Sequence, residues 1–121
     1  MSVASIYRRS SMSDPRFRPR RYTPDPKLFG KAPEIRWNAA LTARQATQVV
    51  ASRIQHDYAV MIRAAADQQH GSLKAYADAT DTDYQRLTRV LRGDAIMRLE
   101  DIADAHRHLG VPLPPVRGQA R

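Results

Sequence analysis

The stretch SLKAYADATDTDYQRLTRVLRGDAIMRLEDIADAHRHLGV, residues 72–111, carries the signals that decide the fold. Ser72 and Asp83 are favoured N-cap residues, because their short side chains accept hydrogen bonds from the free N–H groups at a helix start. Gly93 and Gly110 stand where helices commonly terminate in a left-handed residue. The stretch therefore predicts three short helices, which begin at about residues 72, 83 and 99.

Apolar residues recur through these helices at the spacing of one helical face. The residues expected to face a core are Leu73, Tyr76, Ala77, Leu87, Val90, Leu91, Ile102, Ala103, Leu109 and, just beyond the last helix, Val111. The sequence shows no strand-like alternation of apolar and polar residues. The expected fold class is therefore all-α, a small helical domain.

A longer helix is expected before this stretch, from about Thr42 to Gln69, with Gly71 as its terminator. No proline occurs between Trp37 and Val111, so helices there can keep their backbone hydrogen bonds. The apolar stripe of this region breaks near residues 56 and 57, and the pattern fits either one long helix or two. The stripe contains Val50, Ile54, Met61, Ile62 and Ala65.

Prolines separate both flanks from the central block. Five of the eight prolines lie in the first 36 residues, and the other three are at positions 112, 114 and 115. Proline breaks helix interiors and favours extended chain. We therefore expect a Pro/Arg-rich arm over residues 1–36 that is extended or disordered, a helical domain over 37–111 and a tail over 112–121.

The chain of 121 residues carries a formal net charge of +8, and residues 1–36 supply +6 of it from nine Arg or Lys against three acidic residues. This excess favours an acidic partner. Nucleic acid is favoured over a membrane, because the sequence has no long apolar run. The absence of cysteine excludes disulfides, thiolate zinc sites and cysteine nucleophiles. Because the N-terminus has no apolar signal-peptide region, the cytoplasm is the expected location.

The segment FRPRRY, residues 17–22, mixes guanidinium groups with aromatic rings. This composition suits contact with phosphates, or insertion into a minor groove beside a docked domain. The expected DNA contacts of the arm are Arg16, Arg18, Arg20 and Arg21. The alternative is a solvated tail that only aids solubility.

Residues 72–111 resemble the Cro/C1-type (XRE-like) helix-turn-helix family of phage repressors and bacterial regulators. The resemblance rests on Ala77 at the small position of the first motif helix, the tight turn at 80–82, LRG at 91–93 and LGV at 109–111. It implies a lambda-repressor-like domain, here with a long preceding helix and the basic arm. The departures from the family pattern are Asp81 for a glycine, Thr82 for an aliphatic residue and Leu73 for a glutamine or similar side chain.

In this family the second motif helix, here at about residues 83–92, enters the major groove of DNA. The matching positions imply base contacts from Tyr84, Gln85 and Arg89, and glutamine and arginine are suited to adenine and guanine. The resemblance and the charge pattern together imply phosphate contacts from Ser72, Arg86, Thr88, Arg92 and Arg98.

The sequence thus indicates a sequence-specific transcriptional regulator that binds double-stranded DNA as a homodimer. It is expected to be a repressor of phage or bacterial type, either nucleoid-associated or phage-encoded in a bacterial host. The sequence predicts no enzyme, cofactor or metal site; His106 and His108, two residues apart, fall on different faces of a helix. Two alternatives stay open. One is an antitoxin or adaptor whose helical domain binds a protein partner, and the other is a nucleoid-type protein that binds DNA without sequence preference.

Overall fold

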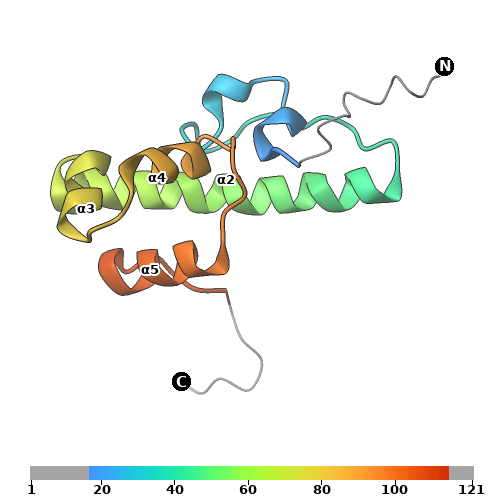
Figure 1. The fold of residues 1–121 in the computed structure, drawn as a ribbon. Helices are drawn as coiled ribbons and strands as arrows, with labels where there is room; N and C mark the ends of the chain where they lie inside the picture. The colour runs from blue at the N-terminus through green and yellow to red at the C-terminus, as the bar shows by residue number, and fades with distance from the viewer. Residues whose placement is uncertain (1–16, 115–121) are drawn as a thin grey trace.

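The computed structural model describes residues 17–114. Within this range every regular element is a helix (Figure 1). The elements are the 3-10 helices η2 (Pro19–Tyr22) and η3 (Pro26–Leu28) and the α-helices α2 (Ala43–His70), α3 (Leu73–Ala79), α4 (Tyr84–Leu91) and α5 (Leu99–Leu109). The long helix α2 runs through the whole molecule, and α3, α4 and α5 pack against it toward its C-terminal end.

The predicted helix starts and stops are confirmed. Thr42 accepts a hydrogen bond from the Gln45 N–H at the start of α2, and the Ser72 hydroxyl accepts one from Ala75 at the start of α3. Gly71 ends α2 with a φ of 89°, a left-handed conformation that glycine adopts without steric penalty. The region 42–69 is therefore one helix rather than two.

The core lies where the C-terminal half of α2 meets the three shorter helices. Most of the residues predicted to face it are buried. Ile102 is only partly buried, and the prediction that Ala103 faces inward is wrong, because this residue is exposed on α5. The buried apolar cluster consists of Tyr58, Ala59, Ile62, Ala66, Leu73, Tyr76, Ala77, Leu87, Val90, Leu91, Ala105, Leu109 and Val111.

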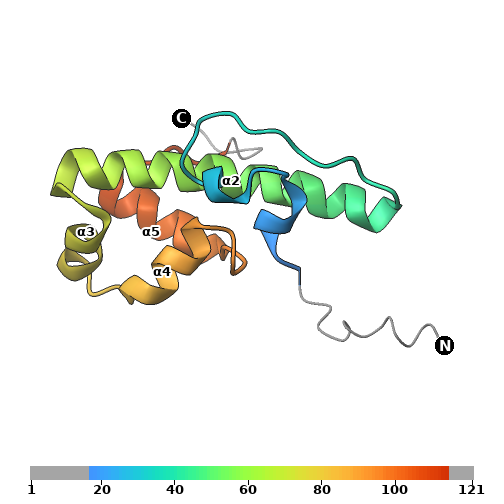
Figure 2. The same ribbon diagram turned by 90° about the horizontal axis from the view of Figure 1, so that it is seen from above.

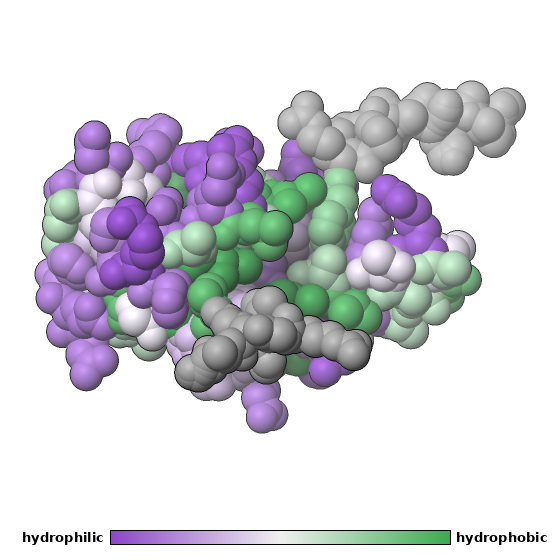
Figure 3. All heavy atoms as spheres, turned by 90° about the horizontal axis from the view of Figure 1, so that it is seen from below, coloured by the Kyte–Doolittle hydropathy of each residue, from purple (hydrophilic) through white to green (hydrophobic). Residues whose placement is uncertain are grey.

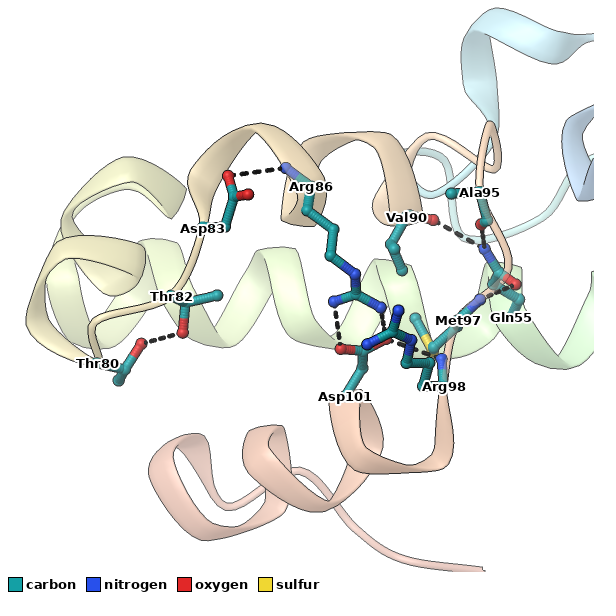
Figure 4. A network of polar contacts seen from close by, with 10 residues as sticks. All are labelled: Gln55, Thr80, Thr82, Asp83, Arg86, Val90, Ala95, Met97, Arg98 and Asp101. Carbon is teal, nitrogen blue, oxygen red and sulfur yellow. Dashed lines mark hydrogen bonds and ion pairs between the residues drawn. The ribbon is translucent and has the colours of Figure 1, made fainter.

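The N-terminal half of α2 turns polar side chains inward. Gln55 is 6% exposed, and its side-chain amide donates to the carbonyls of Val90 and Ala95, each at 2.8 Å. Its carbonyl oxygen accepts from the Met97 N–H at 2.9 Å. These hydrogen bonds, drawn in Figure 4, hold the loop after α4 against α2. By contrast, Val50 and Ile54 are 56% and 52% exposed. These N-terminal residues of the predicted apolar stripe therefore lie outside the core.

The expectation of an extended or disordered arm is wrong for residues 17–36. This segment folds onto α2 and the end of α4 through η2, η3 and the chain that follows, which runs along α2 in Figure 2. Phe29 is 1% exposed, and its ring meets those of Trp37 and His56 edge to face. The Gly30 N–H donates to Nδ1 of His56 at 2.9 Å. An aromatic cluster and a buried hydrogen bond thus order the segment despite its prolines.

No helix in the part of the chain that the structure describes has the length and apolar character needed to cross a bilayer.

Candidate nucleic-acid interface

The turn between α3 and α4 is built from two threonines and an aspartate. Asp81 has a φ of 55°, the left-handed conformation, which Asp tolerates better than most residues other than glycine. The Thr80 hydroxyl donates to the Tyr76 carbonyl at 2.9 Å, so the Thr82 hydroxyl must be the donor in the 2.8 Å contact between the two threonines. The Thr82 N–H donates to Ala77. Asp81 and Thr82 therefore form a closed turn without the glycine and the aliphatic residue.

Asp83 starts α4 by accepting hydrogen bonds from the N–H groups of Gln85 and Arg86, at 3.0 and 3.2 Å. Its carboxylate is thus a helix cap. The next turns of α4 divide clearly between two faces. Leu87, Val90 and Leu91 are buried, whereas Gln85, Arg89 and Arg92 are exposed.

Arg86 points away from that exposed face. Its two terminal nitrogens donate to the two carboxylate oxygens of Asp101 on α5, at 2.8 and 2.9 Å (Figure 4). Both terminal nitrogens of this predicted phosphate contact thus each donate one hydrogen bond within the protein, and its contact with DNA stays a prediction. Arg86 clamps α4 to α5.

The Arg86–Asp101 pair is mostly shielded from water, with side chains 30% and 13% exposed. The hydrogen bond that Arg86 donates to Asp101 raises the pKa of Arg86. Burial alone works to raise the pKa of Asp101, but hydrogen bonds from Arg86 and from the Arg98 N–H outweigh it and hold that pKa below its ordinary value. The pair is therefore charged at neutral pH.

The remaining predicted contacts on α3, α4 and α5 differ in availability. Tyr84 is only partly exposed, because its ring packs against the core cluster, and Lys74 Nζ lies 5.6 Å from the ring centre. The Thr88 hydroxyl donates to the carbonyls of Tyr84 and Gln85, which uses its only proton. Ser72 and Arg98 are exposed at the starts of α3 and α5.

The ordered part of the arm is fastened to the end of α4. The Arg20 N–H donates to the Gly93 carbonyl at 3.0 Å, and its guanidinium binds the Asp94 carboxylate at 3.1 and 3.3 Å. Asp94 also pairs with Arg92, at 3.1 Å. The negative charge of Asp94 therefore pairs with Arg20 of the arm and with Arg92, the residue that follows α4.

Gly93 is required at this junction for two reasons. Its φ is 81°, and a Cβ atom there would lie 2.9 Å from the Arg20 nitrogen and from two carbons of the Phe29 ring. A side chain would push the arm off the end of α4. Gly93 thus ends the helix and also lets a distant segment of chain approach it.

The beginning of the described arm lies beside the exposed face of α4. Phe17, Arg18 and Arg89 line one hollow of about 180 Å³, together with the loop after α4. Arg18 and Arg20 also border a second, more open hollow with Arg21. The structure thus brings these three predicted arm residues close to the predicted reading helix; Arg16 lies outside the described residues.

Sequence reasoning missed Arg63 on α2. Its side chain is partly buried, and its Nε atom has no hydrogen-bond partner. Burial lowers the pKa of Arg63; the charge of Asp67 opposes this shift, and that of Arg92 adds to it. The signal in the sequence was an arginine close to the apolar residues Ile62, Ala65 and Ala66. Charged side chains are rarely buried without a partner, so an arginine in such a segment is a candidate functional residue.

Among residues 17–114, no three side chains of the metal-binding types gather into a group that could hold an ion. Comparisons of the chain with protein-family models, with curated proteins and with solved structures gave no match. The site geometry is therefore the ground for assigning a function.

Proposed function

We propose that this protein is a sequence-specific regulator of transcription, most simply a repressor of phage or bacterial type, that binds double-stranded DNA through α4. The observation that carries the proposal is the division of α4 between two faces. Leu87, Val90 and Leu91 anchor the helix in the core, and Gln85, Arg89 and Arg92 remain exposed on a helix short enough to lie in a major groove.

Within this proposal, Gln85 and Arg89 read bases. A glutamine amide can pair with adenine through two hydrogen bonds, and a guanidinium group can do the same with guanine. Tyr84 is partly exposed, and its ring suits contact with a thymine methyl group. Arg92 is 47% exposed, and it can keep its contact with Asp94 while it reaches a backbone phosphate.

The arm supplies the second part of the proposed interface. Arg18 and Arg21 are exposed and belong to a segment already docked against the end of α4. A docked arm loses less conformational freedom on binding than a free one, so its phosphate contacts contribute more to affinity. Arg63 on α2 adds a partly buried positive charge near Arg92, which favours phosphate at this end of α4.

The test begins with selection of bound sites from a random pool of double-stranded DNA, followed by titration of the selected site and a scrambled one. We expect one enriched motif. Arg89→Ala should weaken binding to that motif by about 1–3 kcal/mol and relax the preference at a single base position. Arg107→Ala, which removes an exposed arginine near the end of α5, is the matched control and should change neither.

Other outcomes have distinct meanings. Equal, strongly salt-dependent binding to every sequence would contradict sequence-specific reading and favour a nonspecific DNA-binding protein. An unchanged preference in Arg89→Ala would show that α4 is not the reading helix. Absence of any DNA binding would overturn the proposal and favour a protein-binding adaptor or antitoxin.

A further inference from the structure

The N-terminal half of α2 has its polar and apolar faces reversed relative to an ordinary surface helix. Ser52, Gln55 and His56 are buried. Gln55 and His56 form hydrogen bonds with Val90 and Gly30, outside α2, whereas the Ser52 hydroxyl donates to the Gln48 carbonyl of its own helix. On the other side of the same helix, Val50 and Ile54 are more than half exposed. When one chain folds by itself, this apolar face stays exposed to water. Such exposure of apolar side chains is unfavourable, and it favours packing against another surface.

The exposed face follows a regular spacing. Ala43, Thr47, Val50 and Ile54 are separated by four, three and four residues, the repeat that forms a straight seam between two packed helices. Ala46 and Ala51 flank the seam and, with three of its members, line an open apolar hollow. Thr47 does not disturb the seam, because its hydroxyl donates to the Ala43 carbonyl of its own helix. Figure 3 shows the molecule from below, and apolar surface gathers on this side of it.

We propose that this seam binds a second copy of the chain, with the two α2 helices packed antiparallel about a twofold axis. The sizes of the side chains support this direction. Antiparallel pairing sets Ala43 against the partner's Ile54, and Thr47 against the partner's Val50. The first pair joins a small residue to a large one, and the second joins two residues of nearly equal shape. Both pairs therefore fill the seam evenly. Parallel pairing would put the two alanines together at one end and the two isoleucines at the other.

Charges along the seam agree with the antiparallel direction. Arg44 and Arg53 flank the seam, and pairing sets each of them beside an alanine of the partner, Ala51 and Ala46, rather than beside another arginine. The exposed carboxylate of Asp57 then lies near the start of the partner's α2, where the helix dipole is positive.

The surface continues beyond the seam. Leu41, just before α2, is 84% exposed, and antiparallel pairing carries the partner's Leu41 past Ile54 toward Tyr58. There the C-terminal chain crosses α2, since the Tyr58 hydroxyl donates to the Pro112 carbonyl, and Leu113 is 41% exposed. Burial of these two leucines enlarges an interface that a seam of three helical turns would leave small.

The proposal does not depend on DNA binding and is tested without DNA, by sedimentation velocity of the full chain from low to high micromolar concentration. We expect a reversible dimer of twice the mass of one chain. Val50→Lys and Ile54→Lys should each shift the chain to monomer, because either one places a cation inside the seam beside arginines of the partner. Circular dichroism and thermal unfolding of these variants check that the exposed substitutions leave each chain folded.

The matched control is Leu28→Lys, at a leucine that is 45% exposed on η3, within the segment that covers the opposite side of α2. This variant should remain a dimer. A wild-type chain that is monomeric at every concentration overturns the proposal. A dimer that survives both seam substitutions shows that another surface forms it, which also overturns the proposal.

The direction of pairing is tested with cysteines, which the natural chain lacks. A mixture of Thr47→Cys and Val50→Cys chains should form a mixed disulfide under mild oxidation, because antiparallel packing brings the two Cβ atoms within bonding reach. Val50→Cys alone should remain uncrosslinked. Efficient crosslinking of Val50→Cys to itself, without the mixed product, would show parallel helices and contradict the antiparallel arrangement.

Discussion

Arg86 on α4 and Asp101 on α5 are joined by two hydrogen bonds of 2.8 and 2.9 Å between planar groups, across fifteen residues of chain. Asp101 also accepts from the Arg98 N–H at the start of its own helix. One carboxylate therefore caps α5 and holds the predicted reading helix in place. This relationship directs an arginine of α4 toward α5 and leads to the first two predictions.

Replacing Arg86 by alanine should lower the free energy of unfolding by about 1–3 kcal/mol, because it leaves the mostly buried Asp101 carboxylate without its main donor. Urea unfolding measures the change. Arg89→Ala, three residues further along and exposed, is the control and should leave stability nearly unchanged. Equal stability of the two variants would contradict a structural role for Arg86.

Stability should fall in acid partly through Asp101. Its pKa is lower in the folded chain than the ordinary value of 3.8, so the folded state binds this proton less readily than the unfolded state. The carboxylate therefore stabilises the fold above pH 3.8, and this contribution disappears as the pH falls through the lower folded value. Unfolding free energies measured against pH should fall less steeply in acid for Asp101→Asn than for the wild type.

The control for this pH dependence is Asp25→Asn. The hydrogen bond from Arg36 also lowers the pKa of Asp25, but this pair is exposed to solvent. Water screens an exposed pair, so this variant should keep nearly the whole acid dependence of the wild type. Parallel profiles for the wild type and Asp101→Asn would contradict the assignment.

Gly93→Ala should destabilise the protein more than Gly71→Ala. Both glycines have a left-handed φ, so alanine strains the backbone at either site by about 1 kcal/mol. Only at Gly93 would the new Cβ atom collide with neighbours, the Arg20 backbone and the Phe29 ring, whereas nothing lies within 4 Å at Gly71. Thermal unfolding of the two variants measures how much stability each one loses. Equal losses would show that the arm moves away from a side chain at position 93 without a cost in stability.

Asp94→Asn should loosen the arm while leaving the helical core folded. The change removes the charged partner of Arg20 and Arg92. We expect faster amide hydrogen exchange in residues 19–30 and little change in α2 and α5. If the proposed function holds, nonspecific DNA affinity should rise, because one negative charge is lost and two guanidinium groups are released. Unchanged exchange in the arm would show that the aromatic cluster around Phe29 and the hydrogen bonds of Arg20 N–H and Gly30 N–H hold it without the Asp94 charge.

Local signals in the sequence predicted the helix boundaries well, because a cap acts through atoms within one turn of its own position. Thr42, Ser72 and Asp83 accept their hydrogen bonds from residues two or three places ahead, and Gly71 and Gly110 end helices through their own φ angles. The spacing of Leu87, Val90 and Leu91 likewise showed which side of α4 is buried, so the exposure of Gln85 and Arg89 followed.

Only the tertiary structure decided the parts that depend on distant residues. Proline content predicted a loose arm, yet Phe29 finds its place against His56, and Arg20 finds Asp94, 74 residues away. The charge of Arg86 was plain in the sequence, but its direction depends on where α5 brings Asp101. Val50 and Ile54 belong to a helical stripe by spacing, and they lie in water because the polar face of α2 meets the rest of the chain. Periodicity and caps are set by neighbouring residues, whereas these outcomes depend on which long-range partner each side chain meets.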